Sequence, residues 1–131
     1  MSENEKPLWI SYQQAVAIHS RQLRRFGGAP GLRDEAMLRS ILERPVNKWS
    51  DEQAPLPELA AAYAFGLAKN RAFADGNKRI AFIAMMTFLD RNEIAFAPDP
   101  AQAAALILAI AAGEVSEVSL TRWIRDNWPS R

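Results

Sequence analysis

Two segments with almost no polar face constrain the fold of this chain more than any other feature. Residues 58–69 and residues 76–91 are rich in Ala, Leu, Ile, Phe and Met, and their charged residues gather near the ends. Neither segment alternates as a half-buried strand does, and they are long enough for about three and about four helical turns. Helices that are apolar on every side lie at the centre of a protein. The sequence therefore predicts an all-α fold built around these two helices.

Four further helices are predicted around this pair. The first follows the capping pair Ser11 and Gln14 and ends at Gly27, and the second begins near Asp34 and ends at Pro45. The fifth covers about residues 99–113, and the sixth begins near residue 119 and places Trp123 and Trp128 on its apolar stripe. Residues 45–57 are bounded by prolines and predict a long loop or a short hairpin.

Length and composition limit the kind of protein further. A chain of 131 residues is expected to form one domain over residues 1–131. A net charge of +1 with 24% charged residues argues against disorder and against bulk attraction to nucleic acid. Cysteine is absent, the polar N-terminus does not resemble a secretory signal, and residues 103–112 are too few to span a membrane. We expect a cytoplasmic protein with no membrane partner.

The polar residues between the two central segments are the candidate site. Residues 73–79 read Phe-Ala-Asp-Gly-Asn-Lys-Arg. A helix that starts at Gly76 and Asn77 offers unpaired backbone N–H groups, and Lys78 and Arg79 add charge, so the loop favours a phosphate. Asp75 is suited to a divalent metal on the same phosphates. The spacing alone also fits a plain turn in which Asp75 caps the helix and both cations are solvated.

This heptad resembles the signature loop of the Fic/Doc family, and Lys before the final Arg is typical of its Doc, or death-on-curing, branch. The resemblance covers nearly the whole chain, because Ile10, the Ile18-His19 pair and the Gly-Gly-Ala-Pro-Gly turn of residues 27–31 also match. It implies a compact six-helix domain with the signature loop between two central buried helices. One position differs: the family motif begins with His, and this chain has Arg71 there.

The resemblance implies a role for each matching residue. Asp75 would help to hold Mg²⁺, Gly76, Asn77 and Lys78 would form an anion nest, and Arg79 would contact nucleotide phosphates. Doc proteins are toxins of toxin–antitoxin pairs that transfer the terminal phosphate of ATP to the elongation factor that delivers aminoacyl-tRNA. Most other family members transfer AMP, and Lys78 argues against that reaction here. Residues 45–57 would contain a flap that aligns the target peptide.

Arg71 bears on activity because the family histidine takes the proton from the target hydroxyl. A guanidinium cannot accept a proton, and loss of a general base costs on the order of 100- to 10,000-fold. The chain is therefore expected to be inactive or nearly so. We favour an inactivating substitution, since the other signature residues are intact. A natural pseudoenzyme, or a non-catalytic module that binds anions or a partner, remains the alternative.

Two aromatic positions outside the heptad also carry expectations. His19 is interpreted as a structural histidine that fixes the turn before the second helix, and Trp49 either docks the target or covers the core. The basic residues of the first helix are expected to be solvated and not to bind nucleic acid.

An antitoxin is the expected partner. Its helix is expected to bind in a groove between the first helix and residues 45–57, with apolar anchors at Ile18, Leu23, Trp49 and Leu56.

Overall fold

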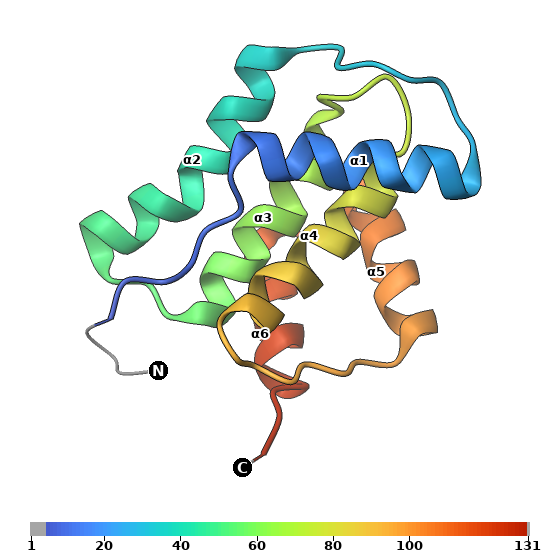
Figure 1. The fold of residues 1–131 in the computed structure, drawn as a ribbon. Helices are drawn as coiled ribbons and strands as arrows, with labels where there is room; N and C mark the ends of the chain where they lie inside the picture. The colour runs from blue at the N-terminus through green and yellow to red at the C-terminus, as the bar shows by residue number, and fades with distance from the viewer. Residues whose placement is uncertain (1–4, 131) are drawn as a thin grey trace.

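The computed structural model describes residues 5–130, and this part of the chain contains six helices and no strand (Figure 1). The prediction that the N-terminus carries no secretory signal rests partly on residues 1–4, which lie outside the described residues. Between residues 5 and 130, no helix is both long and apolar enough to cross a membrane. The helices are α1 (Tyr12–Phe26), α2 (Glu35–Glu52), α3 (Leu56–Asn70), α4 (Asn77–Arg91), α5 (Pro100–Ala111) and α6 (Glu117–Asp126).

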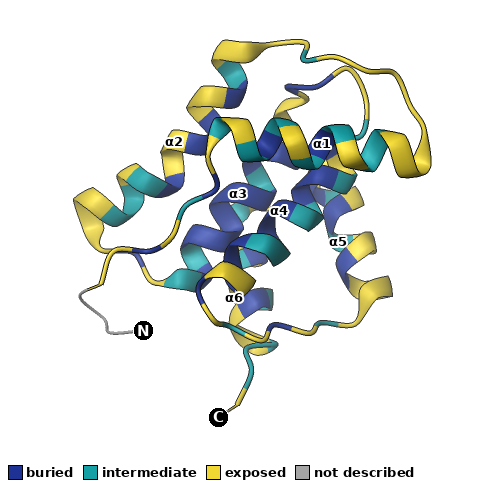
Figure 2. Cartoon of the chain, viewed as in Figure 1, coloured by how far each residue is buried: buried dark blue, intermediate teal, exposed yellow. Residues whose placement is uncertain are grey.

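Helices α3 and α4 form the centre, which confirms the prediction from their apolar sequences. They pack against one another, α2 and α6 pack on α3, α1 packs on α4, and α5 packs on both. Figure 2 shows these two helices as the most continuously buried part of the chain. Tyr63 of α3 and Phe88 of α4 are fully buried, with ring centroids 5.0 Å apart.

Close packing of α2 on α3 depends on a glycine in the middle of α3. A Cβ built on Gly66 would lie 2.8 Å from Cγ2 of Ile41, which is closer than carbon atoms approach without displacement. Any larger residue at this position would separate the two helices. Gly66 therefore marks a contact between α2 and α3 and not a weak point of α3.

Most helix starts carry a capping side chain, as the sequence predicted for the first, second and fifth helices. Ser11, Asp34, Asp99 and Ser116 each accept a hydrogen bond from the backbone N–H three residues later. Helix α4, like α3, has no side chain that caps its first turn, and its N-cap residue is Gly76 with φ +77°. Its first N–H groups are therefore left for another acceptor.

Pro45 does not end α2, so the predicted loop over residues 45–57 is wrong. The helix continues past the proline, and the link to α3 is only residues 53–55. An internal proline costs roughly 3 kcal/mol, because it removes one helical N–H and crowds the preceding turn. The helix continues nevertheless, with the Pro45 ring buried and α2 packed along α3. Contacts between distant elements thus override a local helix breaker.

The same correction applies to the flap and to Trp49. Most of residues 45–57 is helical and presents no strand edge to which a target peptide could pair. Trp49 lies on α2 and packs edge-on against Trp9 with ring centroids 6.4 Å apart. Trp49 is half-buried against the core, as expected for a side chain that covers the core.

The predicted bounds of the sixth helix were also slightly wrong, because α6 begins at Glu117 and ends before Trp128.

The segment before α1 is attached to the core by two polar side chains. The Tyr63 hydroxyl accepts a 3.0 Å hydrogen bond from the Ile10 N–H. Asn92, which follows α4, accepts from the Leu8 N–H and donates to the Leu8 carbonyl. The N-terminal segment is therefore fixed to α3 and to the end of α4.

Candidate functional site

The heptad lies where α3 ends and α4 begins, and a second segment holds it in place. The Ala72 carbonyl accepts from the N–H groups of Arg33 and Asp34, and the Ala74 N–H donates to the Gly31 carbonyl. Leu32 and Phe73 form an isolated antiparallel bridge at the same place. In Figure 1 the loop after α3 accordingly lies beside the segment that joins α1 to α2.

Asn77, expected to form part of an anion nest, points its side chain into the protein. Its Oδ1 accepts from the Phe73 N–H, and its Nδ2 donates to the Phe73 carbonyl, both at 3.0 Å. The side chain is buried and closes the loop on itself. Phe73 is buried as expected, whereas Ala74 is exposed and Ala72 is the small residue that contacts the core. Asn77 can thus offer an anion only its backbone N–H.

Asp75 does not cap α4, so the interpretation of the heptad as a plain capping turn is wrong. Its Oδ1 accepts from the N–H of Gly76 at 2.8 Å, and its Oδ2 accepts from the N–H of Ala29 at 3.2 Å. These two hydrogen bonds, with the nearby charge of Arg79, lower the pKa of the Asp75 carboxyl below its usual value. The exposed group is therefore ionised at neutral pH.

A cavity of about 510 Å³ gathers every residue that the sequence suggested for the site. Three cations and one carboxylate surround it, so the cavity carries net positive charge. The uncapped first turn of α4 adds backbone N–H groups and the positive end of a helix dipole. Leu108, Ala111 and Ala112 of α5 supply an apolar wall that the sequence did not indicate. The lining residues of the heptad region are Arg71, Asp75, Gly76, Asn77, Lys78 and Arg79.

The donor set fits a magnesium ion that arrives with phosphates. Within residues 5–130, no group of three or more His, Cys, Asp or Glu side chains could hold a metal ion. Mg²⁺ usually keeps several waters and binds proteins through one or two carboxylates together with substrate phosphates. The ionised, exposed carboxylate of Asp75 satisfies that requirement, whereas an all-protein cage for the ion does not exist in this region.

Contacts to the end of α1 orient the Arg79 side chain. Its Nη1 donates to the Gly27 carbonyl at 3.4 Å, and its guanidinium lies 5.4 Å from the centre of the Phe26 ring. Phe26 is 60% exposed and presents its ring to the Arg79 guanidinium. The sequence showed the turn at residues 27–31 but gave no sign that it approaches Arg79.

His19 also belongs to this region, which the sequence reasoning missed. Its Nε2 lies 2.7 Å from the Asp75 carbonyl oxygen, and its ring stacks on Phe73 with centroids 3.8 Å apart. The prediction of a hydrogen-bonded structural histidine is confirmed, but His19 contacts the signature loop and not the turn before α2. A contact across 56 positions leaves no local pattern in a sequence.

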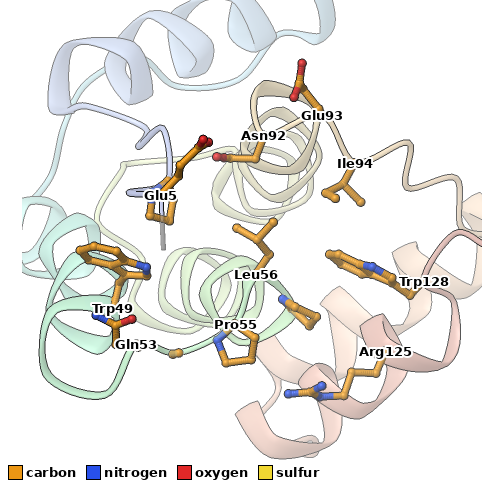
Figure 3. Close-up of a pocket in the computed structure, with 13 residues that line it drawn as sticks. Glu5, Trp49, Gln53, Pro55, Leu56, Asn92, Glu93, Ile94, Arg125 and Trp128 are labelled. Atoms are coloured by element: carbon orange, nitrogen blue, oxygen red, sulfur yellow. The ribbon is translucent and has the colours of Figure 1, made fainter. Parts of the chain in front are cut away.

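A larger cavity, of about 720 Å³, lies at the opposite end of α3 and α4 and contains none of the heptad residues. Figure 3 shows Leu56 between Trp49 and Trp128 in this cavity. No residue of α1 lines it, so this cavity does not join Trp49 and Leu56 to Ile18 and Leu23. The smaller cavity differs in that it combines three cations, the ionised Asp75 carboxylate and the start of α4 at Gly76.

The chain belongs to the Fic/DOC family, whose sequence model matches residues 9–89. It is 32% identical over 117 residues to "Protein kinase doc" of Escherichia phage P1, an alignment that covers 88% of this chain and 92% of that relative. It is also 40% identical over 76 residues to "Toxin Doc" of Mycolicibacterium smegmatis, covering 56% of this chain and 58% of that protein. These relatives place the chain in the Doc branch of the family.

Proposed function

We propose that this chain is the toxin of a toxin–antitoxin pair and is built as a protein kinase of the Doc type. It would transfer the terminal phosphate of ATP, bound with Mg²⁺, to a hydroxyl of the elongation factor that brings aminoacyl-tRNA to the ribosome. The observation that carries this proposal is the uncapped start of α4, which opens into a positively charged cavity beside an ionised Asp75. The names of the two Doc relatives point to the same class.

Each residue of the cavity has a proposed role. The backbone N–H groups of Asn77 and Lys78 bind phosphate oxygens beside Gly76, whose own N–H holds the Asp75 carboxylate. The Lys78 and Arg79 side chains neutralise the phosphate charge. Asp75 would hold Mg²⁺, which when bound would draw electron density from the phosphate oxygens. Asp75 and Arg79 are held by hydrogen bonds before a nucleotide arrives, so these two side chains need little reorganisation.

Arg71 would occupy the position of the general base, so we propose that this chain is inactive or nearly so. Arg71 is exposed, lines the cavity and lies at the end of α3 in the left-handed conformation, with φ 50°. Its permanent charge strengthens phosphate binding but cannot remove a proton from a hydroxyl. The site therefore keeps its affinity for nucleotide and lacks the proton acceptor.

The decisive experiment compares Arg71→His with Arg71→Ala. The histidine variant is expected to arrest growth on induction and to raise phosphotransfer from γ-labelled ATP by roughly 100- to 10,000-fold, because it restores a general base. The alanine variant clears the same space without a base and should remain inactive. A folded histidine variant that binds ATP-Mg yet labels no elongation factor would contradict the proposal. Label from α-labelled ATP would indicate AMP transfer, and no label with nucleotide bound would indicate a binding module.

The antitoxin is proposed to bind beside this cavity. An apolar groove of about 440 Å³ runs between α1, α4 and α5 and shares Lys78, Arg79 and Leu108 with the phosphate cavity. Phe26 and Leu108 are both more than half exposed there. An amphipathic antitoxin helix with apolar anchors and acidic residues would match this groove and cover both cations. Other lining residues are Phe82, Ile83, Pro100 and Ile107.

Hydrogen exchange with and without the antitoxin tests this placement. Protection is expected in residues 78–83 and 104–108, and Leu108→Glu should weaken the complex. Val118→Glu is the matched control, because Val118 is an exposed apolar residue of α6 outside the groove. Protection confined to α6 and the end of α2, or equal effects of the two substitutions, would place the antitoxin elsewhere.

A further inference from the structure

We infer that His19 is a positioning residue that fixes the orientation of the peptide bond between Asp75 and Gly76, and with it the phosphate site. The inference rests on the proposed nucleotide function of the cavity. His19 lies on α1, far from the heptad in sequence, and is only 3% exposed. It does not line the phosphate cavity and thus acts through the loop.

The contact defines which ring nitrogen carries a proton. A carbonyl oxygen can only accept a hydrogen bond, so the 2.7 Å contact requires that Nε2 of His19 donates to the Asp75 carbonyl. The stacking on Phe73, at 3.8 Å between centroids, keeps the ring in the plane that this bond needs. Phe73 is itself held by the buried side chain of Asn77. His19 therefore contacts the loop through a buried and rigid support.

The peptide bond itself links this contact to the site. In a trans peptide the C=O and N–H point in opposite directions. With the Asp75 carbonyl held by His19, the Gly76 N–H points away from α1, where it donates to Oδ1 of Asp75 at 2.8 Å. The Gly76 N–H, which lowers the pKa of the Asp75 carboxyl, is thus kept in place by the hydrogen bond from His19 to the carbonyl of the same peptide group.

Gly76 makes this external support necessary. Glycine has no Cβ and reaches many backbone conformations, so the residue at the start of α4 has little intrinsic preference for its φ of +77°. If the peptide rotated, a carbonyl oxygen would replace the N–H beside the Asp75 carboxylate and would repel phosphate oxygens. His19 prevents that rotation and keeps a donor at the position where negative charge gathers.

Two substitutions separate the parts of the His19 side chain. His19→Phe keeps a flat ring against Phe73 but removes the donor, whereas His19→Gln keeps an N–H near the Nε2 position and removes the ring. Ser20→Ala is the control on the neighbouring position of α1. We expect His19→Phe to weaken ADP-Mg binding, measured by calorimetry, about tenfold, and His19→Gln to remain within about twofold of the unmodified chain. Equal losses in both variants would overturn the inference.

Nuclear magnetic resonance distinguishes failure of this inference from failure of the proposed function. The amide signals of Gly76 and Asn77 should shift or broaden in His19→Phe without nucleotide, and unchanged signals would overturn the positioning role. Absence of ADP-Mg binding in the unmodified chain would instead contradict the nucleotide function. If His19→Phe does not fold, the ring nitrogen signals of His19 in the unmodified chain test the inference instead. An Nε2 without a proton could not donate to the Asp75 carbonyl, and this result would overturn the positioning role.

Discussion

Gly28 and Asp75 lie so close that no side chain fits between them. A Cβ built on Gly28 would stand 2.9 Å from Oδ2 of Asp75, and the φ of Gly28 is +125°. The next residue, Ala29, donates its N–H to the same oxygen. The turn between α1 and α2 therefore shapes the carboxylate proposed to hold the metal, although it lies 47 positions earlier in the sequence.

Gly28→Ala should displace the Asp75 carboxylate and reduce the magnesium dependence of nucleotide binding. We expect ADP-Mg affinity to fall about tenfold, while ADP affinity without the metal changes less. Gly31→Ala is the matched control, because Gly31 also has a positive φ, +112°, but no atom lies within 4 Å of its built Cβ. Equal losses in the two variants would indicate backbone strain alone.

The lowered pKa of Asp75 predicts how the loop responds to acid. Because the folded state favours the ionised carboxylate, its stabilising contribution is complete above the unfolded pKa of about 3.9 and is lost as pH falls through the lower folded pKa. The amide signals of Gly76 and Ala29 should thus stay constant from neutral pH to about 4 and change only below it. Asp75→Asn should abolish this change. A midpoint above about 4 would contradict the assignment.

Gly66→Ala should destabilise the protein although alanine favours helices. The methyl group would lie 2.8 Å from Cγ2 of Ile41, and forcing such a group into a packed interface costs about 1–3 kcal/mol. Urea unfolding measures the loss. In the Ile41→Ala background the same glycine substitution should cost less, because the opposing atom is gone, and additive effects would show that the two residues do not contact.

Tyr63 predicts a loss of stability in alkali. Burial of its hydroxyl raises the pKa to about 12. The unfolded chain ionises this group above pH of about 10, so stability falls between the unfolded and folded pKa values. Tyr63→Phe should remove this pH dependence and lower stability at neutral pH by about 1 kcal/mol, because the Ile10 N–H loses its acceptor. Unfolding midpoints from pH 8 to 11 measure both effects.

The sequence predicted the parts of this protein that local chemistry determines. Apolar periodicity placed α3 and α4 at the centre, and Ser11, Asp34 and Asp99 marked helix starts through their own capping bonds. Pro45 misled because the local sequence does not show that its ring is buried and that α2 packs along α3. The heptad joins α3 to α4 as predicted, and one cavity gathers the suggested residues.

Orientation within the site was harder to predict than location. Nothing in the heptad shows that Asn77 turns inward to bind Phe73, because Asn is equally common on exposed turns. The support from His19 and from the Gly28-Ala29 turn joins segments far apart in the chain. Such contacts depend on how α1 crosses α4, which residue spacing does not specify.

The missing cap on α4 makes the proposed ligand a structural part of the molecule. Four other helices are closed by their own side chains, whereas α4, in the middle of the core, begins at a glycine and leaves its first turn open. A bound phosphate would complete that helix as a serine or aspartate does elsewhere. If the proposed nucleotide binds there, it would stabilise α4, on which α1, α3 and α5 pack directly, and the empty form would lack that stabilisation.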